Sequence, residues 1–406
     1  MNQNAMAATA ISRVQLILPN TILENAWITF ENGTITDFGQ GPSPNTANSV
    51  DGLGHFLAPG FIDTHVHGAN GSDFLDATPE AFSKIAAYHL SRGTTALCPT
   101  LATTTYERMA AVLDVWSEMN ARSESSGASA ARILPVHLEG PHLAATKAGA
   151  QDPKLLRPPT EDEMEWLVKN ASRIAQMTVA PELPKALQLI QRCRGAGIVM
   201  SAGHTEAREE SVRTSISHGV RKVTHLFNAM TYAAKTGLFR QPGLAEYALI
   251  EDRLACELIA DGFHVSPTLM KLAVRSKGSG RLLLVSDALA GTGLPVGSTF
   301  MLGSLPCRVA EGYCELADGS ALAGSATTLM DQVRIMHQNA QVPLVDAVRM
   351  ATHTPASVMG MGDRYGSVGR GCRADFVQFD GNFRIHHVWV RGRLTDGTVA
   401  HEAHRI

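Results

Sequence analysis

The chain has 406 residues, of which 44% are hydrophobic and 18% charged, and its formal net charge is −3 at pH 7. This length is more than one compact core usually serves, so we expect one large domain and a smaller one. The apolar content excludes a largely disordered chain, and the small negative charge excludes a broad nucleic-acid-binding surface. No apolar run approaches the roughly 18 residues of a membrane-spanning helix, so we expect neither nucleic acid nor membrane as a partner.

The cysteines and the N-terminal residues predict a cytoplasmic protein. Six cysteines are scattered along the chain without a Cys-x-x-Cys pair, which is typical of reduced thiols. The N-terminal stretch MNQNAMAATAISR lacks the basic start and the apolar run of a signal peptide.

Both ends of the chain have the pattern of short strands. Alternating apolar and β-branched residues predict strands at 13–18, 25–31, 34–38, 375–380 and 385–391. An Asn-Gly turn joins the second and third of these, and an Asp-Gly turn at 396–397 follows the last. We therefore expect a small β-sandwich domain formed by residues 1–58 together with residues 366–406.

The middle of the chain, residues 59–365, alternates short apolar runs with stretches of helical periodicity. The apolar runs predict eight buried strands, at 61–66, 94–98, 132–138, 177–180, 198–202, 222–226, 254–260 and 281–286. The helical spacing predicts helices at 79–91, 104–121, 160–175, 184–195, 205–218, 266–276, 326–341 and 343–360. This repeated alternation is typical of an α/β fold, a TIM-like (β/α)8 barrel.

Histidines and carboxylates recur where the predicted barrel strands end. They are His65, His67, Glu139, His204, His225, His264 and Asp287. Each one alone is compatible with a core histidine, a helix cap or a turn residue. A barrel, however, brings all its strand ends to one mouth, and two histidines spaced i and i+2 on a strand point to the same side. Imidazole and oxygen donors gathered in this way predict a site for one or two divalent metal ions.

The chain resembles the N-acetylglucosamine-6-phosphate deacetylases of the amidohydrolase superfamily. The motifs PGFID-x-H-x-HG, HLEGP, SAGHT, THLFNAM, QPGLA, ADGFH, SDA and LAGS occur in the family's order. The resemblance implies a metal ion bound by Glu139, His204 and His225. His65 and His67 join a second ion in members that keep this pair, which leaves the number of ions, one or two, open. Asp287 would lie at or between the ions. Zinc is the first expectation, and iron or manganese suits the same donors.

The reaction that this resemblance implies is hydrolysis of an acetamide. N-acetylglucosamine 6-phosphate would be converted to glucosamine 6-phosphate and acetate by a metal-activated water. Asp287 would act as the general base and then as the general acid.

The resemblance also implies where the substrate binds. The phosphate would be met by Asn228, Ala229, Arg240, Asp261, Gly262, Phe263 and His264, and the sugar and acyl group by Ala150, Gln151, Leu322, Ala323 and Gly324. In the family, part of the phosphate site comes from the neighbouring subunit, so we expect a homodimer. The expected small-molecule partner is an N-acetyl amino-sugar phosphate.

Three departures from the family pattern lie where the sugar would bind. Gln151 stands where relatives have a histidine, His142 where they often have another aromatic residue, and the segment 228–240 is longer. N-acetylgalactosamine 6-phosphate therefore stays an alternative substrate. The sequence also leaves open a cyclic-amide hydrolase of the dihydropyrimidinase kind and a non-catalytic barrel scaffold. The former needs a lysine on the fourth strand, and the run MTVAPE has none.

Overall fold

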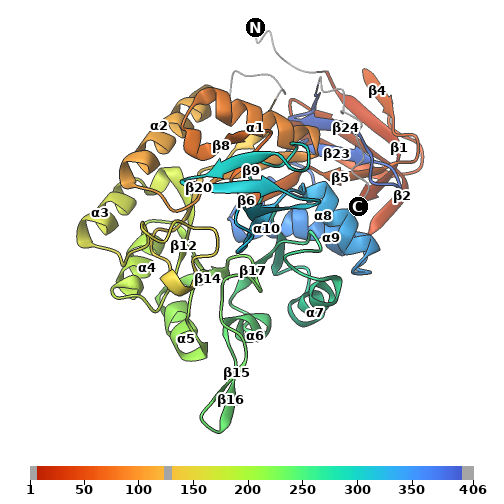
Figure 1. Cartoon of the computed structure of the whole chain (residues 1–406). Helices are drawn as coiled ribbons and strands as arrows, with labels where there is room; N and C mark the ends of the chain where they lie inside the picture. Colours follow the sequence, from red (N-terminus) through yellow and green to blue (C-terminus); the bar gives the residue numbers. More distant parts are fainter. Residues whose placement is uncertain (1–6, 123–129, 396–406) are drawn as a thin grey trace.

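The computed structural model of the protein describes residues 7–122 and 130–395. Strands from the two ends of the chain, red and blue in Figure 1, lie together beside a barrel built from the middle of the sequence. The fold class expected from the sequence, a (β/α)8 barrel with a smaller domain from both termini, is confirmed. The division at residues 58/59 and 365/366 stays a prediction.

The terminal domain is an eight-stranded mixed sheet in the order β25-β24-β23-β5-β1-β2-β3, with β4 paired to β1. Its strands are β1 (Thr9–Ile17), β2 (Ile22–Glu31), β3 (Thr34–Gln40), β4 (Asn48–Asp51), β5 (Phe56–Pro59), β23 (Phe376–Phe379), β24 (Ile385–Val390) and β25 (Arg393–Leu394). Asn32 and Gly33 join β2 to β3 with positive φ angles of 49° and 78°, as a two-residue hairpin turn requires. The turn expected at 396–397 lies outside the described residues.

The barrel contains all eight of the strands predicted from the apolar runs. In spatial order they are β6 (Phe61–Val66), β9 (Thr94–Leu101), β11 (Val136–Glu139), β12 (Ile174–Val179), β13 (Val199–Ala202), β14 (Val220–Val223), β17 (Ala255–Leu258) and β18 (Leu282–Leu284). Every neighbouring pair is parallel, so all C-terminal ends face one mouth. The backbone N–H of Asp287 donates to the carbonyl of His65 at 2.9 Å, which joins the ends of the last and first strands. The short β10 (Arg132–Ile133) pairs with β9.

Helices cover the outside of the barrel. They are α1 (Pro79–Ser91), α2 (Tyr106–Arg122), α3 (Glu161–Lys169), α4 (Ala186–Gly195), α5 (Glu209–His218), α6 (Leu244–Ile250), α7 (Pro267–Lys277), α8 (Leu329–Gln338), α9 (Leu344–Ala351) and α10 (His353–Val358). Sequence signals explain several starts: Thr78 accepts from the backbone of Ala81 ahead of Pro79, and Thr160 and Glu163 form a capping box. None of the described helices is long and apolar enough to cross a lipid bilayer.

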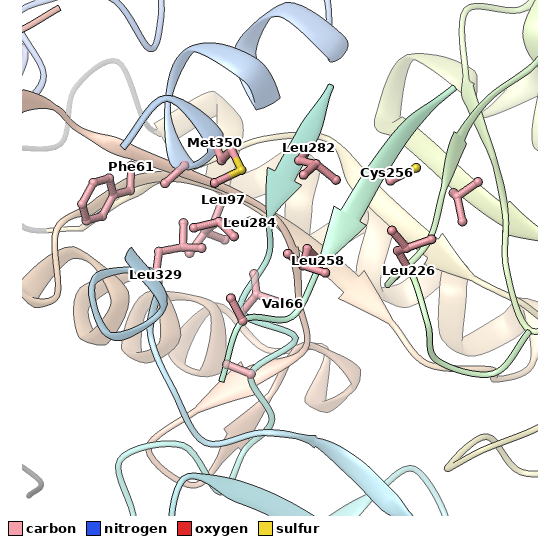
Figure 2. Packing of buried hydrophobic residues seen from close by; sticks show 14 of the residues in the cluster. Phe61, Val66, Leu97, Leu226, Cys256, Leu258, Leu282, Leu284, Leu329 and Met350 are labelled. Atoms are coloured by element: carbon pink, nitrogen blue, oxygen red, sulfur yellow. The ribbon is translucent and has the colours of Figure 1, made fainter. Parts of the chain in front are cut away.

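Side chains from strands and covering helices form one continuous core. Figure 2 shows Leu258, Leu282 and Leu284 on adjacent barrel strands, with Leu329 and Met350 approaching from α8 and α9. All five are buried. Because a close-packed interior resists displacement, these contacts hold the strand ends, and the side chains on them, in fixed relative positions.

Two small sheets were not predicted from the sequence. A hairpin of β15 (Ala234–Thr236) and β16 (Phe239–Gln241) projects away from the barrel at the bottom of Figure 1. A four-stranded antiparallel sheet is inserted after β18, formed by β19 (Thr299–Leu302), β20 (Leu305–Val309), β21 (Tyr313–Leu316) and β22 (Leu322–Ser325). Two very short strands, β7 (Gly68–Ala69) and β8 (Ser72–Asp73), pair just after β6.

Candidate metal centre

The six candidate metal ligands all stand at the C-terminal ends of barrel strands. His65 lies within β6 and Glu139 ends β11, while the others follow within three residues of a strand end: His67 after β6, His204 after β13, His225 after β14 and Asp287 after β18. His204, His225 and Asp287 have positive φ angles of 45°, 29° and 47°. Non-glycine residues rarely adopt this conformation, and it is concentrated at functional sites, where surrounding structure enforces it.

Glu139 is the point where these side chains meet. Its Oε1 lies 3.2 Å from His204 Nε2 and 3.1 Å from His225 Nε2, and these two nitrogens are 3.0 Å apart. Its Oε2 lies 3.3 Å from His67 Nε2.

The second part of the cluster adds Asp287 to the histidine pair of β6. Asp287 Oδ1 is 3.2 Å from His67 Nε2 and 3.4 Å from His65 Nε2, and the two nitrogens are 3.3 Å apart. The exposed fraction of each of the six residues is 7% or less. The structure therefore brings together every residue of the ligand set predicted from the sequence.

The donor set fits a divalent cation. Two groups of three have ligand atoms within 4.8 Å of one another: His65, His67 and Glu139, and Glu139, His204 and His225. Two imidazole nitrogens that face each other cannot both carry a proton. In each pair of facing nitrogens, at least one therefore directs a lone pair at the other nitrogen. A cation between nitrogens and carboxylate oxygens resolves this arrangement, and N/O donors without thiolate suit zinc, iron or manganese.

The charges of the cluster shift the pKa values of its members. Burial would raise the pKa of Glu139, but His65, His204 and His225 hold it well below its usual value. Burial would likewise raise the pKa of Asp287, but His65 and His67 lower it. Both carboxyl groups are thus held as carboxylates, the form that binds cations.

A further layer of side chains orients the histidines. His204 Nδ1 donates to the carbonyl of Lys147 at 2.8 Å, and His65 Nδ1 donates to Glu257 Oε2 at 3.0 Å. Lys222 forms an ion pair with the other oxygen of Glu257. The sequence analysis missed Lys222 and Glu257. The available signal was charge inside short strands, Glu257 in the run ACEL of β17 and Lys222 beside Arg221 in the run VRKV of β14, since a buried charge requires a partner.

Comparison with known proteins agrees with this geometry. The sequence profile of the amidohydrolase family matches residues 56–395. This chain belongs to the amidohydrolase family.

Relatives within the amidohydrolases cover nearly the whole chain. The N-acetylglucosamine-6-phosphate deacetylase of Vibrio furnissii is 33% identical over 367 residues, which are 90% of this chain and 89% of that protein. The N-acetylgalactosamine-6-phosphate deacetylase of Escherichia coli O157:H7 is 31% identical over 340 residues, or 83% of this chain and 87% of that protein.

Solved structures of amidohydrolases give the same result. A point mutant of N-acetyl-D-glucosamine-6-phosphate deacetylase from Mycobacterium smegmatis, in complex with N-acetyl-D-glucosamine-6-phosphate, matches with a TM-score of 0.87 and 29% identity. The match covers 96% of this chain and 99% of that one. The enzyme of the same name from Pasteurella multocida has a TM-score of 0.89 and 27% identity over 96% and 99% of the two chains. The resemblance to N-acetylglucosamine-6-phosphate deacetylases inferred from the sequence motifs is confirmed.

Two of the predicted substrate residues, Gln151 and Gly324, border the metal centre of this amidohydrolase. Gln151 donates from Nε2 to Glu139 Oε2 at 2.8 Å and accepts from the backbone of Thr103 at 2.6 Å, so its amide is held against a candidate ligand. Its neighbour Ala150 is buried. Gly324 lies against the backbone of Asp287, because an added Cβ would come within 2.8 Å of the Asp287 carbonyl. Leu322 and Ala323 precede it in β22, and Leu322 is 39% exposed.

Six of the seven predicted phosphate residues, all except Arg240, form two groups near the mouth. Asp261 Oδ2 accepts from His264 Nδ1 at 2.6 Å, and Asp261 Oδ1 accepts from the backbone of Phe263 and His264. Burial would lower the pKa of His264, but Asp261 and Asp287 raise it, which favours the cationic imidazole. Gly262 belongs to the same turn. Asn228 and Ala229 follow His225, and the Asn228 amide donates to the His225 carbonyl at 3.3 Å.

Two residues singled out from the sequence stand in other surroundings. Arg240 lies on β16, in the projecting hairpin, and is exposed. His142 is fully buried, where Nδ1 donates to the carbonyl of Arg157 at 3.0 Å and Nε2 lies 3.4 Å from the Tyr106 hydroxyl. These partners tie the loop after β11 to the helices outside it.

Proposed function

We propose that this amidohydrolase hydrolyses the acetamide of N-acetylglucosamine 6-phosphate to glucosamine 6-phosphate and acetate. The observation that carries the proposal is the convergence of Glu139, His65, His67, His204, His225 and Asp287 at one barrel mouth. It is supported by relatives named N-acetylglucosamine-6-phosphate deacetylase that match across nearly the whole chain.

The chain's own residues suit this chemistry. Glu139 with His204 and His225, and His65 with His67, would hold one or two divalent ions, for which zinc is the first expectation and iron or manganese also suitable. A bound ion supplies Lewis acidity, polarising the amide carbonyl and lowering the pKa of a water molecule to about 7. Asp287 would take the proton of the attacking water and deliver it to the departing nitrogen. This transfer matters because an amine expelled without a proton is a very poor leaving group.

We further propose that the phosphate is bound by His264 on one subunit and by Arg240 of a second copy. His264, whose raised pKa favours the cationic form, stands beside the centre, whereas Arg240 lies on a hairpin that projects away from its own barrel (Figure 1). Leu238 and Phe239 at the tip of that hairpin are 86% and 71% exposed. An exposed apolar tip next to an arginine suits an interface in a homodimer.

N-acetylgalactosamine 6-phosphate is the alternative substrate, because relatives of both kinds match this chain. Gln151 leaves the choice between the two sugars open. Its side chain carries no charge, and its amide is already bonded to Glu139 and Thr103. The cyclic-amide hypothesis loses support, since β12 has the sequence IAQMTV, without a lysine to bridge two ions.

The test combines metal analysis with acetate release from four compounds: N-acetylglucosamine and N-acetylgalactosamine, each with and without the 6-phosphate. We expect bound divalent metal and fastest turnover of N-acetylglucosamine 6-phosphate. Faster turnover of the galactosamine epimer would select that sugar as the substrate instead. Absence of both metal and turnover would favour a barrel scaffold.

A cytoplasmic location is part of the proposal. It is supported by the six cysteines, all of which are buried free thiols, as in proteins of reducing compartments.

A further inference from the structure

Lys222 and Glu257 form an ion pair inside the barrel. They stand on the neighbouring strands β14 and β17, and neither has any exposed surface. The Lys222 ammonium donates to Glu257 Oε1 and to Gln176 Oε1, and Gln176 Nε2 donates to the carbonyl of Thr64 at 2.6 Å. A buried ion pair generally stabilises a fold no more than well-packed apolar residues of the same volume. Packing therefore gives no sufficient reason for charges here.

The second oxygen of Glu257 faces the metal centre. Glu257 Oε2 accepts from His65 Nδ1 at 3.0 Å and from the backbone N–H of His225 at 3.3 Å. Because the proton on Nδ1 is committed to Glu257, the lone pair of His65 is on Nε2. That atom lies 3.3 Å from His67 Nε2, 3.4 Å from Asp287 Oδ1 and 3.5 Å from Glu139 Oε1.

The four histidines of the centre differ in what holds their outer nitrogen. His204 donates from Nδ1 to a neutral acceptor, the carbonyl of Lys147. The buried Nδ1 atoms of His67 and His225 have no hydrogen-bond partner in the described part of the chain. His65 donates to a carboxylate. A carboxylate acceptor raises the basicity of an imidazole ligand and fixes its orientation, and losing such a partner typically weakens metal binding about 10- to 100-fold.

We propose that the Lys222–Glu257 pair positions His65 for the ion that His65 and His67 hold, and thereby determines whether the centre carries two ions or one. Lys222 fixes Oε1, so that Oε2 stays directed at His65 Nδ1. Both are positioning residues, since they act through the His65 imidazole and, more weakly, through the backbone N–H of His225. The inference rests on the metal centre of the proposed function, and it concerns the binding of the ion and not the identity of the sugar.

The test is a metal titration on the full chain, using variants that remove the carboxylate by two routes. Lys222→Met with Glu257→Leu replaces both charges by apolar side chains of similar size, which leaves no charge unpaired. Glu257→Gln keeps the shape of the side chain, and it replaces the double variant in the titration if that variant does not fold. The matched control is Ser201→Ala, which deletes a buried barrel hydroxyl whose one side-chain hydrogen bond among the described residues is to Thr224.

We expect the wild-type chain and Ser201→Ala to bind two cobalt(II) ions. In the variants without the carboxylate, affinity for one ion should fall about 10- to 100-fold, with a changed visible absorption spectrum for that ion, while the other ion binds as before. The inference is overturned if the wild-type chain saturates at one ion. It is also overturned if both affinities in the variants stay within about twofold of wild type.

The titration needs no substrate, so the two proposals fail separately. A wild-type chain that binds two ions but releases no acetate from any sugar phosphate would contradict the proposed function and leave the role of Lys222 and Glu257 intact.

Discussion

The position of Asp287 is determined by contacts from two other elements. Its backbone N–H donates to the carbonyl of His65, and its own carbonyl accepts from Ser325 N at 2.9 Å. Gly324 packs directly against that carbonyl. These contacts from β6 and β22 enforce the positive φ of Asp287 and direct its carboxylate to His65 and His67, where a proton carrier would be needed.

Replacing Asp287 by asparagine should remove the proton carrier and preserve the site. The amide has the size of the carboxyl group, so the fold and substrate binding should persist, while kcat falls about 10²- to 10⁴-fold. Steady-state acetate release, with isothermal titration of substrate into the variant, separates the two effects. Acetate release near the wild-type rate would remove Asp287 from the proton transfer.

The histidines and acids near the C-terminal ends of the barrel strands could be predicted from the sequence, whereas the buried pair Lys222 and Glu257 could not. His204, His225 and Asp287 each follow a recognisable apolar run, and the barrel rule assigns all such positions to one mouth. Lys222 and Glu257 lie within β14 and β17. Strands of a parallel barrel are covered on both faces and show no alternation that tells which face a charged residue takes. Only the structure pairs them.

At the scale of elements, helix α1 is tied to the metal centre through His89. This side chain has no exposed surface, and its Nε2 donates to the carbonyl of Gly68, directly after His67, at 3.2 Å. Burial lowers the pKa of His89 to about 4. The contact thus exists with a neutral imidazole throughout the neutral range of pH.

His89 should make the folded state sensitive to acid. Its folded pKa of about 4 lies below the unfolded value near 6.5, so the unfolded chain takes up the proton first as the pH falls. Stability present above pH ~6.5 is then lost towards pH ~4, by on the order of 3 kcal/mol. His89→Gln keeps a donor for Gly68 but does not titrate.

The measurement is the change in Tm between pH 7 and pH 4.5 for wild type and for His89→Gln. The Tm of the variant should decrease less than that of wild type between the two pH values. Loss of metal at low pH affects both proteins alike. Equal losses would show that His89 does not control the acid sensitivity.

The hairpin of β15 and β16 offers a comparison within one element. Arg240 pairs in register with Lys235 on the opposite strand, and both are exposed cations. Arg240→Ala should raise KM for the phosphorylated sugar about 10- to 100-fold, the effect of losing a charge-assisted hydrogen bond, with little change for the unphosphorylated sugar. Lys235→Ala is the matched control and should leave both KM values unchanged. Equal effects of Arg240→Ala on both sugars would exclude Arg240 from the phosphate site.

The elements that escaped prediction have a common physical feature. The strands of the hairpin and of the β19–β22 sheet have only three to five residues each, and several of their side chains are exposed. Such segments are too short for a periodic apolar pattern and are stabilised by turns and by the larger body. The longest barrel helices, α1 and α2, by contrast, have 13 and 17 residues of amphipathic sequence and were placed from it.

At the scale of the whole molecule, the terminal sheet packs against the barrel at the N-terminal ends of β6 and β9. Gly93, which precedes β9, leaves no room for a side chain between Phe61 of β6, Val377 of β23 and Ile385 of β24. The terminal sheet therefore supports the start of the first barrel strands, and the candidate metal centre lies at their other ends. The terminal strands of the described residues thus support the barrel from the end opposite its mouth.

The proposed sharing of a site between two copies predicts complementation between two impaired variants. A hybrid dimer of Arg240→Ala with Asp287→Asn has one complete site: the first chain supplies Asp287 and the second supplies Arg240 across the interface. Random reassortment of equal amounts makes half of the dimers hybrid, each with one complete site of two, so activity should recover to about a quarter of wild type. The measurement is acetate release at low substrate concentration, after mixing under conditions that exchange subunits. If Arg240 acted on its own subunit, no hybrid site would be complete, and activity after mixing would equal the mean of the two variants alone.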